Sequence, residues 1–536
     1  MSTGPSTRDP RTLVPAYLLT VLAATVLAAT LVPSDQIPTL IATVGSWAIP
    51  SIALGPGRRH LSHGLLVAAT VMLMVRGYSG LPVEARVVAL VGVGVCLSVF
   101  VLRPLRTYRR FPFLHLLCLV QASYLYLGAL LGQPKPDRAV LFPTEVRTTG
   151  IVYTVVFFTV LVIAALAVDA ALGRRGPAPD PADLEQLSPV SLPRAYLLAA
   201  GAAALAAVLT VSGLGSQLGT GVELIRLVGM GGLLLLVLRW LNGDLGWVHK
   251  LVLAGALSGY VLWGLGLGIL YEAARPGFLV LALYLVRRRS VPWLLVLGAM
   301  LAFVVLNIGK AEYRMRTWER NIDGTVAQDR AISSTASGLD YLTNISETYG
   351  DEENAVSVAA YRFSNADLLG YFVTNVPSRY PHYGLSSYTS LPVVLVPRIL
   401  YPDKPTYATA NEIGRRYELI AEFDLATSVN TPIAAEAYVA AGPTFFVLVA
   451  VGTGAFISLL AYWLRSLRPA TVLTGCLLCF QLLQTIESGI FGLFLIVPYA
   501  VLLYPVMRWA AGPVVAREPA PTGITDAGSA TTRRAR

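Results

Sequence analysis

Residues 151–175 read IVYTVVFFTVLVIAALAVDAALGRR, an apolar run that ends in two arginines. A helix needs about twenty apolar residues to cross the hydrocarbon core of a bilayer, and this run is long enough. Arg174 and Arg175 follow where the chain would leave the membrane, and basic residues beside a span favour the cytoplasmic side. The stretch therefore predicts a transmembrane helix and its direction.

The composition extends this prediction to the whole chain. The 536 residues are 55% hydrophobic and 13% charged, with a mean hydropathy of +0.62, which is typical of a polytopic membrane protein. The net charge of +10 comes from short basic clusters between apolar runs. That distribution indicates membrane topology, so no nucleic-acid partner is expected.

A window of about nineteen residues predicts about fourteen spans. The first group covers 13–32, 38–54, 61–76, 85–102, 111–131 and 150–172; the second covers 194–212, 224–241, 248–270, 274–286 and 291–309; the last covers 441–464, 470–486 and 490–510. With the N-terminus in the cytoplasm, every inside loop carries positive charge, as in Arg58 and Arg59. The short outside loops PSDQIP and GLGSQLGTG carry none. Both termini are therefore expected in the cytoplasm.

The predicted fold class is an all-α polytopic membrane protein with about fourteen transmembrane helices and one large folded extracytoplasmic loop. The predicted divisions are a first helix group (1–172, about six spans), a Pro-rich cytoplasmic linker (173–193), a second helix group (194–309, about five spans), the loop (310–436), three C-terminal spans (437–511) and a disordered cytoplasmic tail (512–536).

The large loop is expected to contain its own folded elements, because a structureless loop of this length is rare. Helical spacing of apolar residues predicts a helix over 355–376. The stretch LPVVLVPRILYPDKP, residues 391–405, is too short to span and is read as a re-entrant or interfacial element at the outer membrane face.

Charged groups near the outer membrane face are costly and mark candidate sites. Guanidinium groups present planar, bidentate donors to phosphate oxygens, and lysine adds a mobile point charge. A basic cavity there would suit a lipid with a phosphate or diphosphate head group. Prolines on both sides of Arg398 and Lys404 would hold these two cations in place.

The segment after residue 270 resembles the oligosaccharide repeat unit polymerases, the O-antigen polymerase family. The likeness covers about residues 270–445 and rests on AARPGFLVLALYLVRRR, then YRFSNADLLGYFVTNVP, YGLSSYTSL and VPRILYPDKP, followed by NTPIAAEAYVAAG. It implies an enzyme that joins polyprenyl-diphosphate-linked oligosaccharides outside the cytoplasmic (inner) membrane of a bacterium. The lipid diphosphate would be the leaving group, and neither a cofactor nor a metal would be needed.

The resemblance also implies roles for particular residues. The expected diphosphate-binding residues are Arg226, Arg275, Arg362, Arg398 and Lys404. The base that accepts the acceptor hydroxyl's proton is Asp367, His382 or Glu436. The partners are the lipid-linked oligosaccharide and membrane lipid, and a separate protein that sets chain length is left open.

Three alternatives stay open at this point. An O-antigen-ligase-like enzyme would use the same donor with a different acceptor. A glycosyltransferase of the C-type fold would need paired acids in the first outer loop, where this chain has only Asp35. A glycolipid transporter or flippase would need polar groups at mid-membrane, and few ionisable residues lie within the predicted spans.

Overall fold

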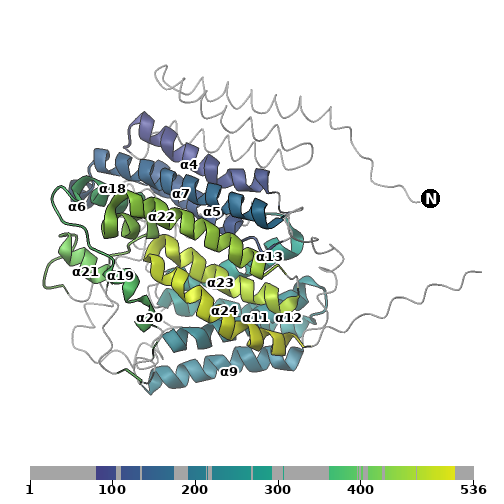
Figure 1. Cartoon of the computed structure of the whole chain (residues 1–536). Coiled ribbons are helices and arrows are strands. Elements are labelled where there is room, and N and C mark those ends of the chain that lie inside the picture. Colours follow the sequence, from purple (N-terminus) through teal and green to yellow (C-terminus); the bar gives the residue numbers. More distant parts are fainter. Residues whose placement is uncertain are drawn as a thin grey trace, which may run out of the picture.

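The computed structural model describes residues 80–173, 191–292, 361–401 and 409–512, with short gaps inside each range, and Leu306. Every regular element in these residues is a helix (Figure 1). The first are α4 (Val83–Leu102), α5 (Phe113–Tyr124), the π-helix Leu125–Leu131, α6 (Pro136–Leu141), α7 (Thr144–Gly173), α9 (Leu192–Val211), α11 (Thr220–Leu241), α12 (Trp247–Gly266) and α13 (Leu270–Arg288). The others are α18 (Ala366–Asn375), α19 (Ser386–Thr389), α20 (Leu391–Val394), α21 (Thr409–Arg416), α22 (Ile433–Trp463), α23 (Pro469–Ser488) and α24 (Ile490–Ala511).

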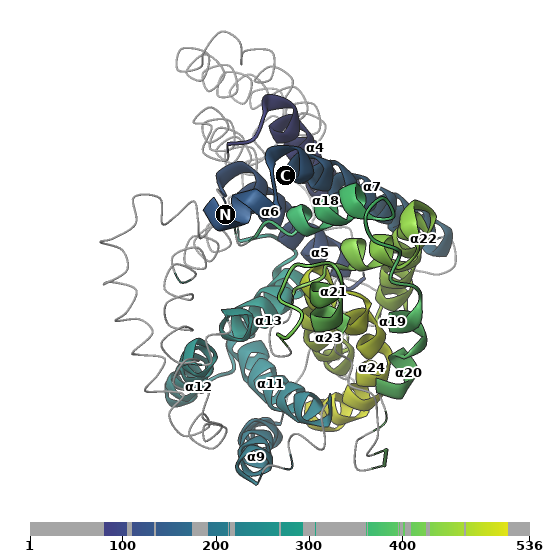
Figure 2. The same cartoon turned by 90° about the vertical axis from the view of Figure 1, so that its left-hand side faces the viewer.

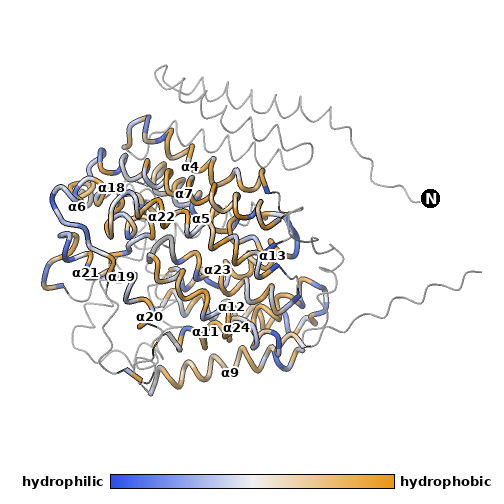
Figure 3. The backbone as a smooth tube through the Cα atoms, in the orientation of Figure 1, coloured by the Kyte–Doolittle hydropathy of each residue, from blue (hydrophilic) through white to orange (hydrophobic). Residues whose placement is uncertain are grey.

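Eight helices in the described residues are long and apolar enough to cross a membrane. They are α4, α5 with its π-helical continuation, α7, α9, α11, α12, α22 and α24. Helices α13 and α23 also form where spans were predicted, although neither reaches the same length of apolar sequence. Figure 3 shows an apolar middle with hydrophilic segments toward both ends of the bundle. The predicted spans 13–32, 38–54 and 61–76, and 291–309 except Leu306, lie outside the described residues.

The helices pack in two neighbouring groups, seen from one end in Figure 2. One group contains α4, α5, α7, α18 and α22, and the other contains α9, α11, α12, α13, α23 and α24. The two groups meet where α23 contacts α5 and α22. Most buried apolar side chains of both groups form one continuous core, and two smaller clusters lie beside α4 and between α12 and α13.

Basic residues from separate predicted inside loops meet at one end of the bundle. Asp169 of α7 pairs with Arg110, and Arg289 Nη1 lies 3.4 Å from the Arg110 carbonyl oxygen. The guanidinium groups of Arg110 and Arg465 both lie over the ring of Tyr462, at 5.3 and 4.1 Å. The alternation of helix directions predicted from the loop charges therefore agrees with the packing of these described segments.

The described helices of the segment predicted as a large loop, residues 310–436, gather at the opposite end. Helix α18 lies there beside α6 and the first turns of α7 and α22, and α19, α20 and α21 lie at the same end of the bundle (Figures 1 and 2). Of the helix predicted over 355–376, residues 355–360 and Arg362 lie outside the described residues, 363–365 form a turn, and α18 covers Ala366–Asn375. Of the interfacial stretch 391–405, the structure describes the short helix α20 and the exposed residues Val396, Leu400 and Tyr401.

Glycines allow α18 to dock directly on the backbone of α7. A Cβ on Gly370 would overlap the carbonyl oxygen of Val146, and a Cβ on Gly150 would overlap that of Ala366. Such contact brings the two helix backbones closer than side chains would permit. The loop is thus attached to a membrane helix by main-chain packing.

Candidate functional site

A kink divides α22 just below the loop elements. Ala441 (φ −152°, ψ 24°) and Gly442 (φ 79°, ψ −164°) leave the helical conformation, and Pro443 follows. Proline has no N–H, so the Val439 carbonyl loses its usual helical partner four residues on. The backbone N–H of Tyr383 donates to this carbonyl at 2.8 Å, and the next N–H, of Gly384, donates to Ala440 at 3.0 Å. The loop therefore completes the hydrogen bonding of a broken helix.

This docking sets His382 against the kink. A Cβ on Gly442 would lie 3.2 Å from the His382 Cε1 atom, so the imidazole occupies the space above a glycine that also needs its positive φ. Arg416 Nη2 donates to the His382 carbonyl at 3.1 Å, and the guanidinium lies 5.2 Å from the centre of the Tyr383 ring. His382 Nδ1 is buried and has no hydrogen-bond partner among the described residues.

Glu436 lies on the same N-terminal part of α22 and is only 3% exposed. Its Oε2 accepts a hydrogen bond from the backbone N–H of Ile490 at 2.8 Å. Ile490 is the first residue of α24, so the carboxylate satisfies an N–H at a helix N-terminus, where negative charge is favoured. The Ser387 hydroxyl of α19 lies beside the carboxylate. Glu436 Oε1 is buried and makes no hydrogen bond of good geometry to the described residues.

Arg275 and Arg226 belong to a second cluster, near the start of α11, the end of α12 and the start of α13. Arg275 is fully buried, and its Nη2 lies 2.8 Å from Glu223 Oε1 and 3.1 Å from Glu272 Oε1. Its guanidinium also lies 4.3 Å from the ring centre of Phe480. Two carboxylates thus compensate its charge inside the bundle, as a buried arginine requires.

Arg226 is held less tightly. Its guanidinium lies 4.9 Å from the ring centre of Trp263 on α12, and its side chain is half-buried. Stacking on an indole orients a guanidinium without using its N–H donors. Arg226 is therefore better able than Arg275 to bind an additional anion.

Asp367 lies in a third place, between α18 and α7. Its Oδ2 is 3.5 Å from Arg147 Nε, and both side chains are almost completely buried. The side chains of Tyr361 and Ser364 also lie beside the carboxylate, and Arg147 Nη2 donates to the Gly132 carbonyl at 3.2 Å. Burial raises the pKa of Asp367, and the Arg147 charge opposes that shift. The pair anchors α18 beside the Gly150–Gly370 contact.

The predicted site residues therefore fall into separate groups. His382 and Glu436 flank one short part of α22, Arg226 and Arg275 share the second cluster, and Asp367 is apart from both. Arg362, Arg398 and Lys404 lie outside the described residues.

Two residues near His382 and Glu436 were not predicted as site residues. They are Arg416, which holds the His382 carbonyl, and Ser387, which lies beside Glu436. Ser387 lies in the YGLSSYTSL stretch that carries part of the family resemblance. Its proximity to Glu436 depends on tertiary contacts that residue spacing does not reveal.

The fold and these clusters define the class of the protein as an all-helical membrane protein with a folded polar layer at one end. A family model described as a domain of unknown function (DUF8712) matches residues 277–505, less than half of the chain. The matched residues include His382 and Glu436 and exclude Arg226 and Arg275. No curated protein and no solved structure matches the chain.

Proposed function

We propose that the protein is a glycosyltransferase that polymerises polyprenyl-diphosphate-linked oligosaccharide repeat units at the outer face of the cytoplasmic membrane. The observation that carries the proposal lies at the kink of α22. His382 packs against Gly442, Arg416 donates to the His382 carbonyl, and Glu436 lies on the same part of α22. An imidazole, a carboxylate and a guanidinium supply the proton acceptor and cation that glycosyl transfer from a lipid diphosphate requires. The family resemblance of residues 270–445 adds independent support.

The proposed reaction joins two lipid-linked oligosaccharides. A hydroxyl at the non-reducing end of the incoming unit attacks the anomeric carbon of the growing chain. The new C–O bond forms as the bond to the lipid diphosphate breaks, and the hydroxyl proton passes to a base. The lipid diphosphate leaves with the bonding electron pair, and cations stabilise its developing charge.

Among the three predicted bases, His382 and Glu436 have the more suitable surroundings. Each keeps one buried polar atom without a hydrogen bond to the described residues, His382 Nδ1 and Glu436 Oε1. Asp367 also has buried oxygens without a hydrogen bond of good geometry to the described residues, but its carboxylate differs in being paired with a buried cation, with Oδ2 3.5 Å from Arg147 Nε. We therefore assign the proton transfer to His382 or Glu436 and a docking role to Asp367.

The predicted cations can be ranked in the same way. Arg226 stacks on an aromatic ring and forms no ion pair among the described residues, whereas two carboxylates compensate Arg275. We therefore assign diphosphate binding to Arg226 with the loop residues Arg362, Arg398 and Lys404, and we assign Arg275 to holding the helices around that site.

We also propose that both termini face the cytoplasm. The meeting of Arg110, Arg289 and Arg465 at one end supports this orientation, because basic loops favour the cytoplasmic side. A cysteine introduced at exposed Glu422 should react with a membrane-impermeant maleimide in intact cells, and one at Arg465 should react only after permeabilisation. The reverse labelling pattern would overturn the orientation.

The direct test is reconstitution of the purified protein in liposomes with lipid-linked repeat units. Growth of long glycan without an ion gradient is expected. Arg398→Ala or Lys404→Ala should leave protein in the membrane while single-repeat products accumulate. Normal polymer from both variants would show that Arg398 and Lys404 do not bind the diphosphate. Transfer of glycolipid across the liposome membrane without bond formation would indicate a transporter in place of a polymerase.

A second experiment separates the two bases. Glu436→Gln keeps the shape and an acceptor for the Ile490 N–H but removes the carboxylate charge, and His382→Gln removes the imidazole. The variant that lacks the base should lose about 10²–10⁴-fold in rate, since this is the usual contribution of general acid–base catalysis. Glu145→Gln, a change to an exposed glutamate in the first turn of α7 at the same end of the bundle, is the control and should retain the parent rate.

A further inference from the structure

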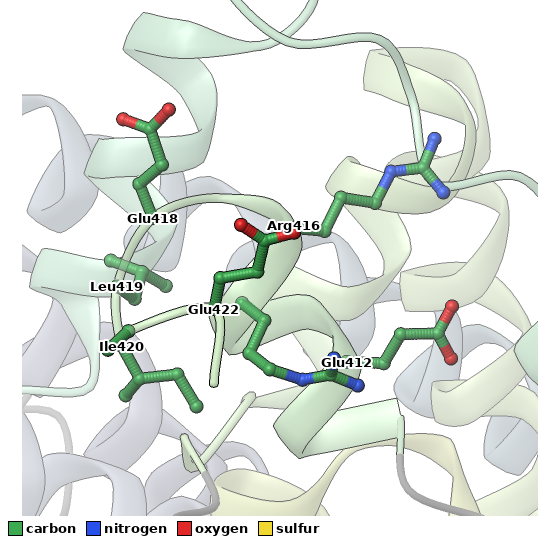
Figure 4. Close-up of a pocket in the computed structure, with 8 residues that line it drawn as sticks. Glu412, Arg416, Glu418, Leu419, Ile420 and Glu422 are labelled. Atoms are coloured by element: carbon green, nitrogen blue, oxygen red, sulfur yellow. The ribbon is translucent and has the colours of Figure 1, made fainter. Parts of the chain in front are cut away.

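A polar hollow lies on the loop layer, next to the segment that carries His382. Its volume is about 760 Å³, and it is formed by α21 and the residues that follow it. In Figure 4, Glu422 lies between a side made by Glu418, Leu419 and Ile420 and a side made by Arg416 and Glu412. The volume falls within the range of about 300–1,000 Å³ found for small-molecule sites.

Contacts around the rim hold the charged lining groups in position. Glu418 Oε2 accepts hydrogen bonds from Arg379 Nη2 at 2.6 Å and from the Tyr380 hydroxyl at 2.7 Å. Arg415 Nε, also in the lining, donates to Asn411 Oδ1 at 2.9 Å. A hollow whose polar groups are held before a ligand arrives loses less conformational entropy on binding.

The charge pattern of the lining selects the chemistry of the ligand. Three carboxylates, from Glu412, Glu418 and Glu422, would repel a phosphate, and the guanidinium groups of Arg415 and Arg416 would repel a metal or an amine. A ligand with many hydroxyl groups meets both kinds of partner, because each hydroxyl donates to a carboxylate and accepts from a guanidinium. The apolar side chains of Leu419 and Ile420 can cover the C–H face of a sugar ring.

We infer that the hollow binds uncharged sugar units of an oligosaccharide. The inference deepens the proposed function and rests on it for the source of the sugar, which would be the repeat unit attached to the lipid diphosphate. Arg416 lines the hollow and donates to the His382 carbonyl, so a sugar chain bound there would lead toward the kink of α22. The lipid and diphosphate would then lie on the membrane side of His382.

The test measures binding without the lipid. The probe is the oligosaccharide released by mild acid from the host's own lipid-linked repeat units, observed by saturation-transfer NMR with the full-length protein in nanodiscs. The variants are Glu422→Ala and Arg415→Ala, and the control is Glu145→Ala, an exposed glutamate in the first turn of α7 at the same end of the bundle. Each variant should bind about tenfold or more weakly, the usual loss for one hydrogen bond to a charged group, and the control should bind like the parent.

Binding that weakens in both variants and resists competition by inorganic pyrophosphate supports the inference. Absence of binding by the parent, equal binding by all proteins, or displacement by pyrophosphate would overturn it. Size-exclusion chromatography identifies a variant that is misfolded. If Glu422→Ala is misfolded, Glu422→Gln takes its place, because Glu422 is exposed and glutamine keeps its shape. Parallel reconstitution in liposomes separates the two proposals. Sugar binding without chain growth supports the hollow as a sugar site and rejects the polymerase. Chain growth without binding at the hollow supports the polymerase and rejects the sugar site.

Discussion

Gly489, the single residue between α23 and α24, carries the sharpest stability prediction. Its φ of 75° and ψ of −159° lie in a region that only glycine adopts readily, so alanine there costs about 1–3 kcal/mol. The new Cβ would also overlap Glu436 Oε2 and displace the carboxylate from the Ile490 N–H. Loss of a hydrogen bond to a charged group costs about 1.5–3 kcal/mol. Gly489→Ala should therefore lower the free energy of unfolding by about 2.5–6 kcal/mol.

The assay is reversible unfolding of the purified protein in mixed micelles with increasing SDS. Gly452→Ala is the control, because Gly452 is exposed in α22 and a Cβ there would meet open space. Gly489→Ala is also made in a Glu436→Ala protein. In that protein the new Cβ has no carboxylate to overlap, and the hydrogen bond from the Ile490 N–H to Glu436 is already absent. There the cost of Gly489→Ala should fall to the backbone part, about 1–3 kcal/mol. Equal costs in the two backgrounds, or a Gly489→Ala protein as stable as the control, would refute the coupling between Glu436 and the α23–α24 turn.

Other changes test the docking of the loop. Gly370→Ala should push α18 away from α7 and cost about 1–3 kcal/mol in the same assay; an unchanged midpoint would contradict the close helix contact. Asp367→Ala removes the buried carboxylate that pairs with Arg147 and should lower the free energy of unfolding by about 3–5 kcal/mol. Adding Arg147→Met should recover part of that loss. A further loss in the double variant would argue against the ion pair. Gly442→Ala opposes the positive φ and crowds the His382 imidazole, so polymerisation in liposomes should slow while the membrane level of the protein holds; full-length glycan at the parent rate would count against a role for the kink.

The helical membrane architecture was predictable from residue patterns because each span is a local property. An apolar run satisfies its backbone hydrogen bonds internally and needs no information from distant residues. The predicted spans 150–172, 224–241 and 490–510 correspond to α7, α11 and α24 with small shifts of their ends. Boundaries near the loop were less accurate. Helix α22 begins at Ile433 rather than near 441, since IAAEAYVA is helical but ends at a kink set by Gly442 and Pro443.

The sequence analysis selected His382, Glu436 and Asp367 as candidate bases and left them unranked. The structure adds that Glu436 and Asp367 are buried and that His382 is partly buried. Asp367 differs because its partner, Arg147, is more than two hundred residues earlier in the chain. Ser387 and Arg416 were not selected because nothing in their local spacing shows that they lie beside Glu436 and the His382 carbonyl.

What the sequence determined by itself was a chain of apolar helices with basic loops alternating along it, because hydropathy and charge act over a single span. Only the tertiary structure decided which charges are already compensated. Arg275 lies between Glu223 and Glu272, whereas Arg226 lies against Trp263 and forms no ion pair among the described residues. The physical reason is that the cost of a buried charge depends on the partners that packing brings within about 4 Å. For Arg275 these include Glu223 of another helix as well as Glu272 of its own, and the spacing of residues along the chain does not show that Glu223 lies there.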